Sequence, residues 1–398
     1  MLLKSHFGVI ILVWAVHCNA QYRIDLSSKV SIEVNANLET YFFAEKLAVE
    51  KIDNFVFDHS GEDYSHQPIV YFGFQHFRKF KDLPSITRIA ELLKQIRDTY
   101  YDNAPITNYL ITLKEFPAIG SRYEIQNIDT TSTQINSVLK EIADSLRRFY
   151  IQANVGKFLK DNAAFYQGAL KEEVKDIDVL AYTAMESWYG KTFPHYIIFL
   201  VPSMPITAGE DNYRGIGTQI HSPGGLIPAM MISSETMVAR QSSLSDYRKF
   251  GFDNPRVTRM LTKHEMGHSF INPLLEKYRL QLEADSGLYT PGLKEVLSPH
   301  YINDWFVCVI EHLVRLGEIR SAVMIKNITE AQRLRSTHIG EYKCVLLPLL
   351  ENKIQEYENN GIQQPDFDSY LPKLMLYLHS LNPVIIDEQV QKFKVYLN

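Results

Sequence analysis

Residues 264–268 read His-Glu-Met-Gly-His, an HExxH motif whose side chains can bind a zinc ion and use it. On a helix, residues four apart share one face, so His264 and His268 can bind one ion at adjacent tetrahedral corners. Glu265 lies beside that ion, where its carboxylate can act as a general base toward a water that the metal activates. The motif therefore predicts a hydrolytic site with one Zn2+ per chain.

The residues around the motif predict a bounded helix. Asn254 is a typical N-cap, and Pro255 suits the first helical position. The pair Asn272-Pro273 predicts the end of the helix, which gives it about 16 residues. This setting favours a metal site over the alternative of two histidines packed in a core.

A catalytic zinc needs a third protein ligand and an open fourth position. No third histidine follows at the metzincin spacing, so an acidic residue from a later helix is the next candidate. Glu311 lies in a predicted helix that is apolar on nearly every side, where a carboxylate is costly unless it is paired or bound to metal. The alternative is that Glu311 forms a helical ion pair with Arg315. If Glu311 is the ligand, Arg315 would instead hold its carboxylate in position. Glu276 and Glu283 are closer in sequence but are typical of loops or solvated helices.

Two weaker expectations concern the substrate. His300 and Tyr301, just before the Glu311 helix, are candidate oxyanion donors, although surface loop residues are the simpler interpretation of both. The strand at 229–233 follows Pro228, which suggests an edge position. Such an edge could bind an extended peptide by strand addition.

The order of the predicted elements indicates an α+β fold with a mixed sheet in the N-terminal part and a mainly helical C-terminal part. Predicted strands and helices follow one another as a strand at 30–34, helices from 37 and at 89–96, a helical stretch over 132–189, strands at 195–201 and 228–234, and helices from 254 onward. Residues 53–86 and 205–226 are expected to be irregular. We predict one domain over 21–398, with an N-terminal lobe to about 250 and a helical lobe over about 251–398.

The first 20 residues have the pattern of a signal peptide. Lys4 is followed by an apolar run that ends at Cys18-Asn19-Ala20, so cleavage is expected before Gln21. The protein is thus predicted to be secreted, periplasmic or extracellular, without a transmembrane segment after cleavage. A lipid anchor on Cys18 is the alternative. Lys and Arg number 41 against 46 Asp and Glu, which gives no support for a nucleic-acid partner.

Two cysteines remain after cleavage, Cys308 and Cys344. Both lie in apolar helical contexts, so buried free thiols and a disulfide are both open. Their number excludes a zinc site made of cysteines. The oligomeric state is also open.

Several stretches resemble an uncharacterised, mainly bacterial family of secreted proteins. They are Val30-Ser-Ile-Glu-Val-Asn-Ala-Asn-Leu38-Glu, Lys263-His-Glu-Met-Gly-His-Ser-Phe-Ile-Asn-Pro273, Glu311 with Arg315, and Tyr357-Glu-Asn-Asn-Gly361. That family is a domain of unknown function grouped with the zincin-like metallopeptidases of the gluzincin type. The resemblance covers roughly residues 28–380 and implies a zincin-like fold with a glutamate ligand. In the best-known gluzincins, the glutamate ligand follows the second histidine at a shorter interval than the one between His268 and Glu311 here.

Together these features predict a secreted zinc metallopeptidase that hydrolyses peptides or proteins, with Glu265 as the base. One alternative is a zinc hydrolase that acts on another amide or an ester. Another is a secreted, non-catalytic binding protein that keeps zinc for stability, although such a site has no need of Glu265.

Overall fold

The computed structural model describes residues 22–52, 63–99, 104–125, 133–206, 213–359 and 366–394. The predicted signal peptide, its cleavage site and Cys18 lie outside the described residues. No helix in the described ranges is both long and apolar enough to cross a membrane.

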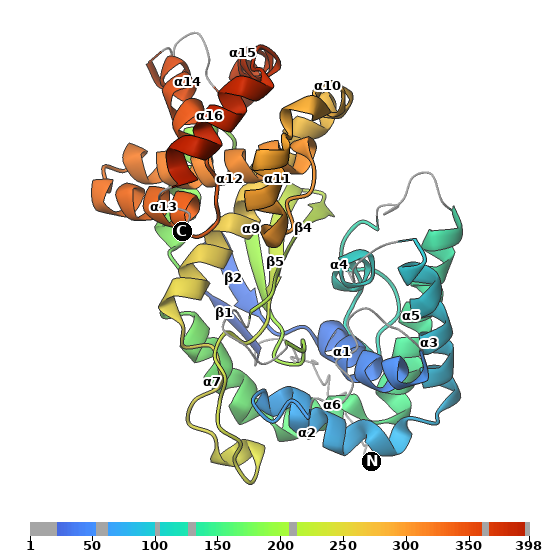
Figure 1. The fold of residues 1–398 in the computed structure, drawn as a ribbon. Helices are drawn as coiled ribbons and strands as arrows, with labels where there is room; N and C mark the ends of the chain where they lie inside the picture. Colours follow the sequence, from blue (N-terminus) through green and yellow to red (C-terminus); the bar gives the residue numbers. More distant parts are fainter. Residues whose placement is uncertain are drawn as a thin grey trace, which may run out of the picture.

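One mixed five-stranded sheet lies at the centre of the molecule (Figure 1). Its strands are β1 (Arg23–Asp25), β2 (Val30–Glu33), β3 (Tyr196–Leu200), β4 (Gly215–Ser222) and β5 (Gly225–Ile232). The spatial order is β1-β2-β3-β5-β4, with β2, β3 and β5 parallel and the outer strands β1 and β4 antiparallel to their neighbours. The prediction of an α+β fold with one mixed sheet is confirmed.

Helices make up most of the rest of the chain. The α-helices are α1 (Ala36–Ala48), α2 (Pro68–Phe77), α3 (Pro84–Arg97), α4 (Ala104–Thr112), α5 (Thr133–Gln152), α6 (Val155–Asp161), α7 (Ala163–Glu173), α8 (Val179–Tyr189), α9 (Pro255–Leu275), α10 (Arg279–Ala284), α11 (Pro291–Leu297), α12 (Trp305–Met324), α13 (Ile328–Gly340), α14 (Leu347–Asn359), α15 (Phe367–His379) and α16 (Pro383–Lys394). Short 3-10 turns join several of them.

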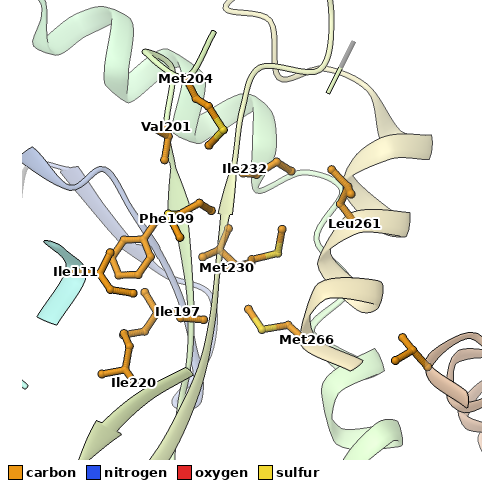
Figure 2. Packing of buried hydrophobic residues seen from close by; sticks show 14 of the residues in the cluster. Ile111, Ile197, Phe199, Val201, Met204, Ile220, Met230, Ile232, Leu261 and Met266 are labelled. Carbon is orange, nitrogen blue, oxygen red and sulfur yellow. The ribbon is translucent and has the colours of Figure 1, made fainter. Parts of the chain in front are cut away.

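The sheet has a helical layer on each face. Helix α9 packs on β4 and β5, and α8 and α12 pack against α9 on the same side. Figure 2 shows Leu261 and Met266 of α9 facing Met230 of β5, while Phe199 of β3 meets Ile111 of α4 on the opposite face. All five residues of β3 are buried, which explains why this parallel strand reads as an unbroken apolar run.

Two predictions about the middle of the chain were wrong. Residues 215–222 form strand β4 rather than part of a loop, because two of its glycines fit closely against α9, as described below. Strand β5 is not an edge, since it pairs with β3 on one side and β4 on the other. Pro228 is tolerated because its nitrogen faces away from β4, and the pairing of β5 with β3 begins only at Ala229.

The stretch 53–86 is also more regular than predicted. It includes α2, which carries His76, and the start of α3, while the ring of His66 is hydrogen-bonded to the carbonyl of Ile206 at 3.1 Å. Neither histidine contributes to the candidate metal site.

Candidate metal centre

Helix α9 positions the HExxH motif, and it is longer than predicted. The Asn254 side chain accepts a hydrogen bond from the backbone N–H of Val257, with Pro255 at the first helical position, as expected. The helix does not end at Pro273 but continues to Leu275. Pro273 cannot donate to the carbonyl of Ser269, and this carbonyl instead accepts a hydrogen bond from Gln219 Nε2 of β4 at 3.3 Å. The proline therefore ties α9 to the edge strand.

Helix α12 supplies the third candidate ligand. Asp304 caps this helix by accepting a hydrogen bond from Val307 N at 2.8 Å, and α12 packs along α9. This packing places Glu311 beside both histidines of the motif, although 42 residues lie between His268 and Glu311 in the sequence. Glu276 and Glu283, the alternatives in sequence, instead pair with Arg279 at the surface.

The three candidate ligands converge on one point. His264 Nε2 lies 3.2 Å from His268 Nε2 and 3.4 Å from Glu311 Oε2, and His268 Nε2 lies 3.5 Å from Glu311 Oε1. Ligand atoms bound to zinc at about 2.1 Å with tetrahedral angles are about 3.4 Å apart. The two imidazoles and the carboxylate therefore lie close enough together to hold one zinc ion between them.

Glu265 points to the edge strand rather than to this group. A Cβ atom at Gly217 would lie 2.8 Å from Glu265 Oε2, and one at Gly215 would lie 3.0 Å from Oε1. Any larger residue at either position would displace the carboxylate. The two glycines of β4 thus make room for the predicted base between α9 and the strand.

Polar side chains support the two histidines from behind. His264 Nδ1 lies 3.1 Å from Glu318 Oε1, and His268 Nδ1 lies 3.1 Å from Asn272 Oδ1. A histidine that binds a metal through Nε2 keeps its proton on Nδ1, so Glu318 and Asn272 can accept it and fix each ring. The other oxygen of Glu318 lies 3.1 Å from His338 Nε2.

Arg315 lies between the ligands and this supporting layer. Its guanidinium is 3.4 Å from Glu311 Oε2 and stacks on the ring of Tyr342 at 4.4 Å. It also lies 2.8 Å from His264 Nδ1, which cannot be a hydrogen bond when that nitrogen carries its proton. The ion pair with Glu311, treated above as an alternative to ligation, therefore coexists with the approach of Glu311 to both histidines.

The charges of the site favour ionised carboxylates. Burial alone would raise the pKa of Glu311, but His264, Arg315 and His268 together hold it well below its usual range. Glu318 behaves in the same way, because His338 and His264 outweigh the effect of its burial on the pKa. Burial and Arg315 act to lower the pKa of His264, whereas Glu311 and Glu318 raise it to about 9.

The two candidate oxyanion donors are placed differently. Tyr301 is 82% exposed and adopts a left-handed backbone conformation, and no contact in the described residues joins it to the ligands. The ring of His300 lies 6.2 Å from that of Tyr342, which stacks on Arg315. The hydroxyl of Tyr342 is 3.4 Å from that of Tyr213, just before β4.

A groove of about 380 Å³ opens beside His268, lined by β4, α4, the end of α9 and Glu124 with Ile125. The backbone N–H of Glu124 donates to the carbonyl of His221, so this carbonyl points away from β5. By the two-residue period of a strand, the main-chain groups of Gly217 and Gln219 point the same way. Within the described ranges these groups have no backbone partner, so the exposed edge of β4 is next to the candidate metal site.

Cys308 and Cys344 are free, buried thiols in the structure rather than a disulfide. Burial is also the main cause that raises the pKa of each thiol. His312 points away from the ligands, as expected from its position next to Glu311, and its ring is hydrogen-bonded to the carbonyl of Cys308.

Sequence reasoning missed several residues of the site. Glu318 lies seven residues after Glu311 on α12 and so on the same face, and Asn272 lies four after His268, so both could have been found by helical period. The contribution of Gly215, Gly217 and Gln219 could not be found in this way, because it depends on how β4 packs on α9.

An HExxH helix and a glutamate from a second helix thus converge beside the edge of a mixed sheet, which defines an α+β protein with a candidate metal centre. The chain belongs to a family described as a domain of unknown function (DUF4932), whose profile matches residues 30–376. No curated protein and no solved structure matches the chain.

Proposed function

We propose that this protein is a secreted zinc metallopeptidase of the gluzincin type with a zincin-like fold. The observation that supports this most strongly is the convergence of His264, His268 and Glu311: the two Nε2 atoms are 3.2 Å apart, and each lies 3.4 to 3.5 Å from one Glu311 oxygen, close to the spacing of ligands around zinc. The position of Glu265 outside this set adds a general base, which a purely structural zinc site does not need.

When bound, the zinc ion would lower the pKa of a water molecule and polarise the carbonyl of the substrate. Glu265 would take the proton from the attacking water and pass it to the leaving amine. Glu318 and Asn272 would hold the ligand rings in one orientation, and Arg315 would orient the Glu311 carboxylate.

The substrate class follows from the edge of β4. The outward main-chain groups of Gly217 and Gln219 can hydrogen-bond an extended peptide beside Glu265 and His268. This replaces the earlier expectation that residues 229–233 provide the edge. A small ester or amide would not use such an edge, which favours peptides over the alternative of another zinc hydrolase.

Metal removal tests this proposal. We expect the purified chain to contain about one zinc, as a single HExxH site requires, and to cleave a mixed peptide library read by mass spectrometry. Cleavage should be lost after chelation and dialysis and should return when zinc is added. Full cleavage by a metal-free preparation would contradict the proposal, and a full zinc site without cleavage of any peptide would favour the non-catalytic alternative.

A further inference from the structure

A second cavity, of about 810 Å³, is lined in part by residues 114–118 and Arg122, which shortly precede Glu124 and Ile125 of the groove beside His268. Its interior is apolar and aromatic, with Phe116, Leu159 and Tyr166 buried and Tyr150 half-buried. The Tyr166 hydroxyl is already bonded to Glu39 at 2.7 Å, so Tyr166 offers the cavity its ring rather than its hydroxyl. A volume and lining of this kind suit a small organic molecule.

The rim of the cavity is basic. Lys114, Arg122 and Lys160 line it together with a single acidic residue, Glu115. Arg122 is neutralised by Glu33 at 3.1 Å. Lys114 and Lys160 have no acidic partner within ion-pair distance in the described part of the chain, so two ammonium groups remain to attract an anion. Burial, followed by the charge of Glu33, raises the pKa of Glu115, which weakens its competition for them.

The local structure shapes this cavity in a defined way. The buried side chain of Asn37 donates to the carbonyl of Lys114 at 3.2 Å and accepts from the N–H of Phe116 at 2.8 Å, which fixes the wall. A Cβ atom at Gly156 would lie 2.4 Å from the Tyr150 hydroxyl, so glycine at this position allows Tyr150 to line the cavity. Both the wall and the aromatic lining are therefore specified by the sequence.

The same segment also reaches the candidate metal site. Residues 114–118 line the second cavity, while Glu124 and Ile125 line the groove, and Glu124 is hydrogen-bonded to β4. A ligand in the cavity would therefore contact the segment that flanks the groove.

We propose that this cavity is a binding site for a small aromatic carboxylic acid, with the ring against Phe116, Tyr150 and Tyr166 and the carboxylate between Lys114 and Lys160. The apolar interior accepts the ring, and the two ammonium groups select an anion over a neutral analogue. The proposal does not depend on the zinc chemistry, because none of these residues contacts the candidate ligands.

The test uses the full mature chain and three probes: phenylacetate, indole-3-acetate and 2-naphthoate, each with its neutral amide. Binding is measured by isothermal titration calorimetry and by saturation-transfer NMR at low salt. We expect at least one acid to bind, and its amide to bind about tenfold more weakly, since the amide loses both charge contacts.

The double variant Lys114→Gln/Lys160→Gln should weaken binding of the acid by a similar factor. The matched control Lys294→Gln/Lys373→Gln, two exposed lysines on α11 and α15, should leave it unchanged. Because all four lysines are exposed, the variants should fold, which circular dichroism can verify. Equal binding of acid and amide, equal effects of the two double variants, or no binding of any acid below about 10 mM would each overturn the proposal.

Discussion

Two clusters of carboxyl groups lie along helix α9, one near its start and one beside the HExxH motif in its middle, and they are built in opposite ways. Near the HExxH motif, Glu311 and Glu318 lie among His264, His338 and Arg315. Near the start of the helix, Glu173 of α7 and Glu235 approach the hydroxyl of Thr258 at 3.5 and 3.0 Å. Within the described residues no basic side chain forms an ion pair with either of these two.

The pKa values differ accordingly. Basic neighbours hold the pKa values of Glu311 and Glu318 well below the usual range, although Glu318 is fully buried and Glu311 is half-buried. Burial raises the pKa of Glu235 to about 8, and burial together with the charge of Glu235 raises that of Glu173. The same residue type is therefore anionic in one cluster and protonated in the other, and the basic partners account for the low pKa values near the motif.

The hydrogen bonds around Thr258 support the raised pKa values of Glu173 and Glu235. The Thr258 hydroxyl has one proton, but Glu235 Oε2, the carbonyl of Asn254 and Glu173 Oε2 all lie within 3.5 Å of it. A carboxyl group that keeps its own proton can donate it to the Thr258 oxygen, which agrees with the raised pKa values of Glu173 and Glu235. Of these two clusters, the one around Glu311 has the deprotonated carboxylates that metal binding requires.

The largest effect is expected from Glu311→Ala. Loss of a direct ligand should reduce zinc affinity by more than the about 10–100-fold that is typical when a supporting residue is lost. Zinc affinity can be measured by competition with a chromogenic chelator, with Glu283→Ala as the matched control because Glu283 only pairs with Arg279. Unchanged affinity in Glu311→Ala would place the third ligand elsewhere.

A smaller effect is expected in the supporting layer. Glu318→Gln keeps the size of the side chain but removes the negative charge that faces His264, so zinc affinity should fall by about 10–100-fold. The zinc affinity of Arg315→Ala should fall by a similar factor, because the contact of Arg315 with Glu311 is lost. In the same competition assay, Glu295→Gln on the surface of α11 should match the parent. If Glu318→Gln also matched it, Glu318 would not be a partner of the metal site.

The smallest effect is expected at the other cluster, and it depends on pH. The native state keeps a proton on the Glu173–Glu235 pair that the unfolded chain releases near pH 4.5, so stability should fall as pH rises from about 5 to about 8. Glu235→Gln removes the part of this dependence that comes from Glu235 and should stabilise the protein by about 1–2 kcal/mol at pH 9 and little at pH 5. Glu173 keeps its own pH dependence, because burial is the main cause that raises its pKa.

Chemical denaturation at both pH values, with Glu295→Gln as the control, measures this difference. An equal effect of Glu235→Gln at pH 5 and pH 9 would contradict the claim that the native state keeps a proton on the Glu173–Glu235 pair. Stabilisation of the parent by added calcium at pH 9 would mean that a cation can take the place of the proton, and the contrast between the two clusters would then fail.

Much of this arrangement could be predicted from local patterns in the sequence. The cap at Asn254, the apolar run of β3 and the HExxH spacing act over one or two turns or one strand, so their consequences are visible in the sequence alone. Glu311 could be proposed because a carboxylate in an apolar helix requires a partner.

The errors occurred where distant segments decide the outcome. Pro273 does not end α9, because the Gln219 side chain of β4 donates a hydrogen bond to the Ser269 carbonyl that the proline leaves without its helical partner. The glycines of β4 are signs of close packing on Glu265 rather than of a loop. The cluster of Glu173 and Glu235 had no signal at all, because α7 and the chain before α9 meet only in three dimensions.

The most direct test of the central claim compares the parent with Glu265→Gln, at equal zinc content, on a mixed peptide library read by mass spectrometry. Glu265 is not a ligand in this scheme, so the variant should fold and bind zinc as the parent does. Loss of the general base should reduce the rate of peptide cleavage by roughly 10²–10⁴-fold. Equal rates of cleavage by parent and variant would show that Glu265 is not the base, and the proposed mechanism would be wrong.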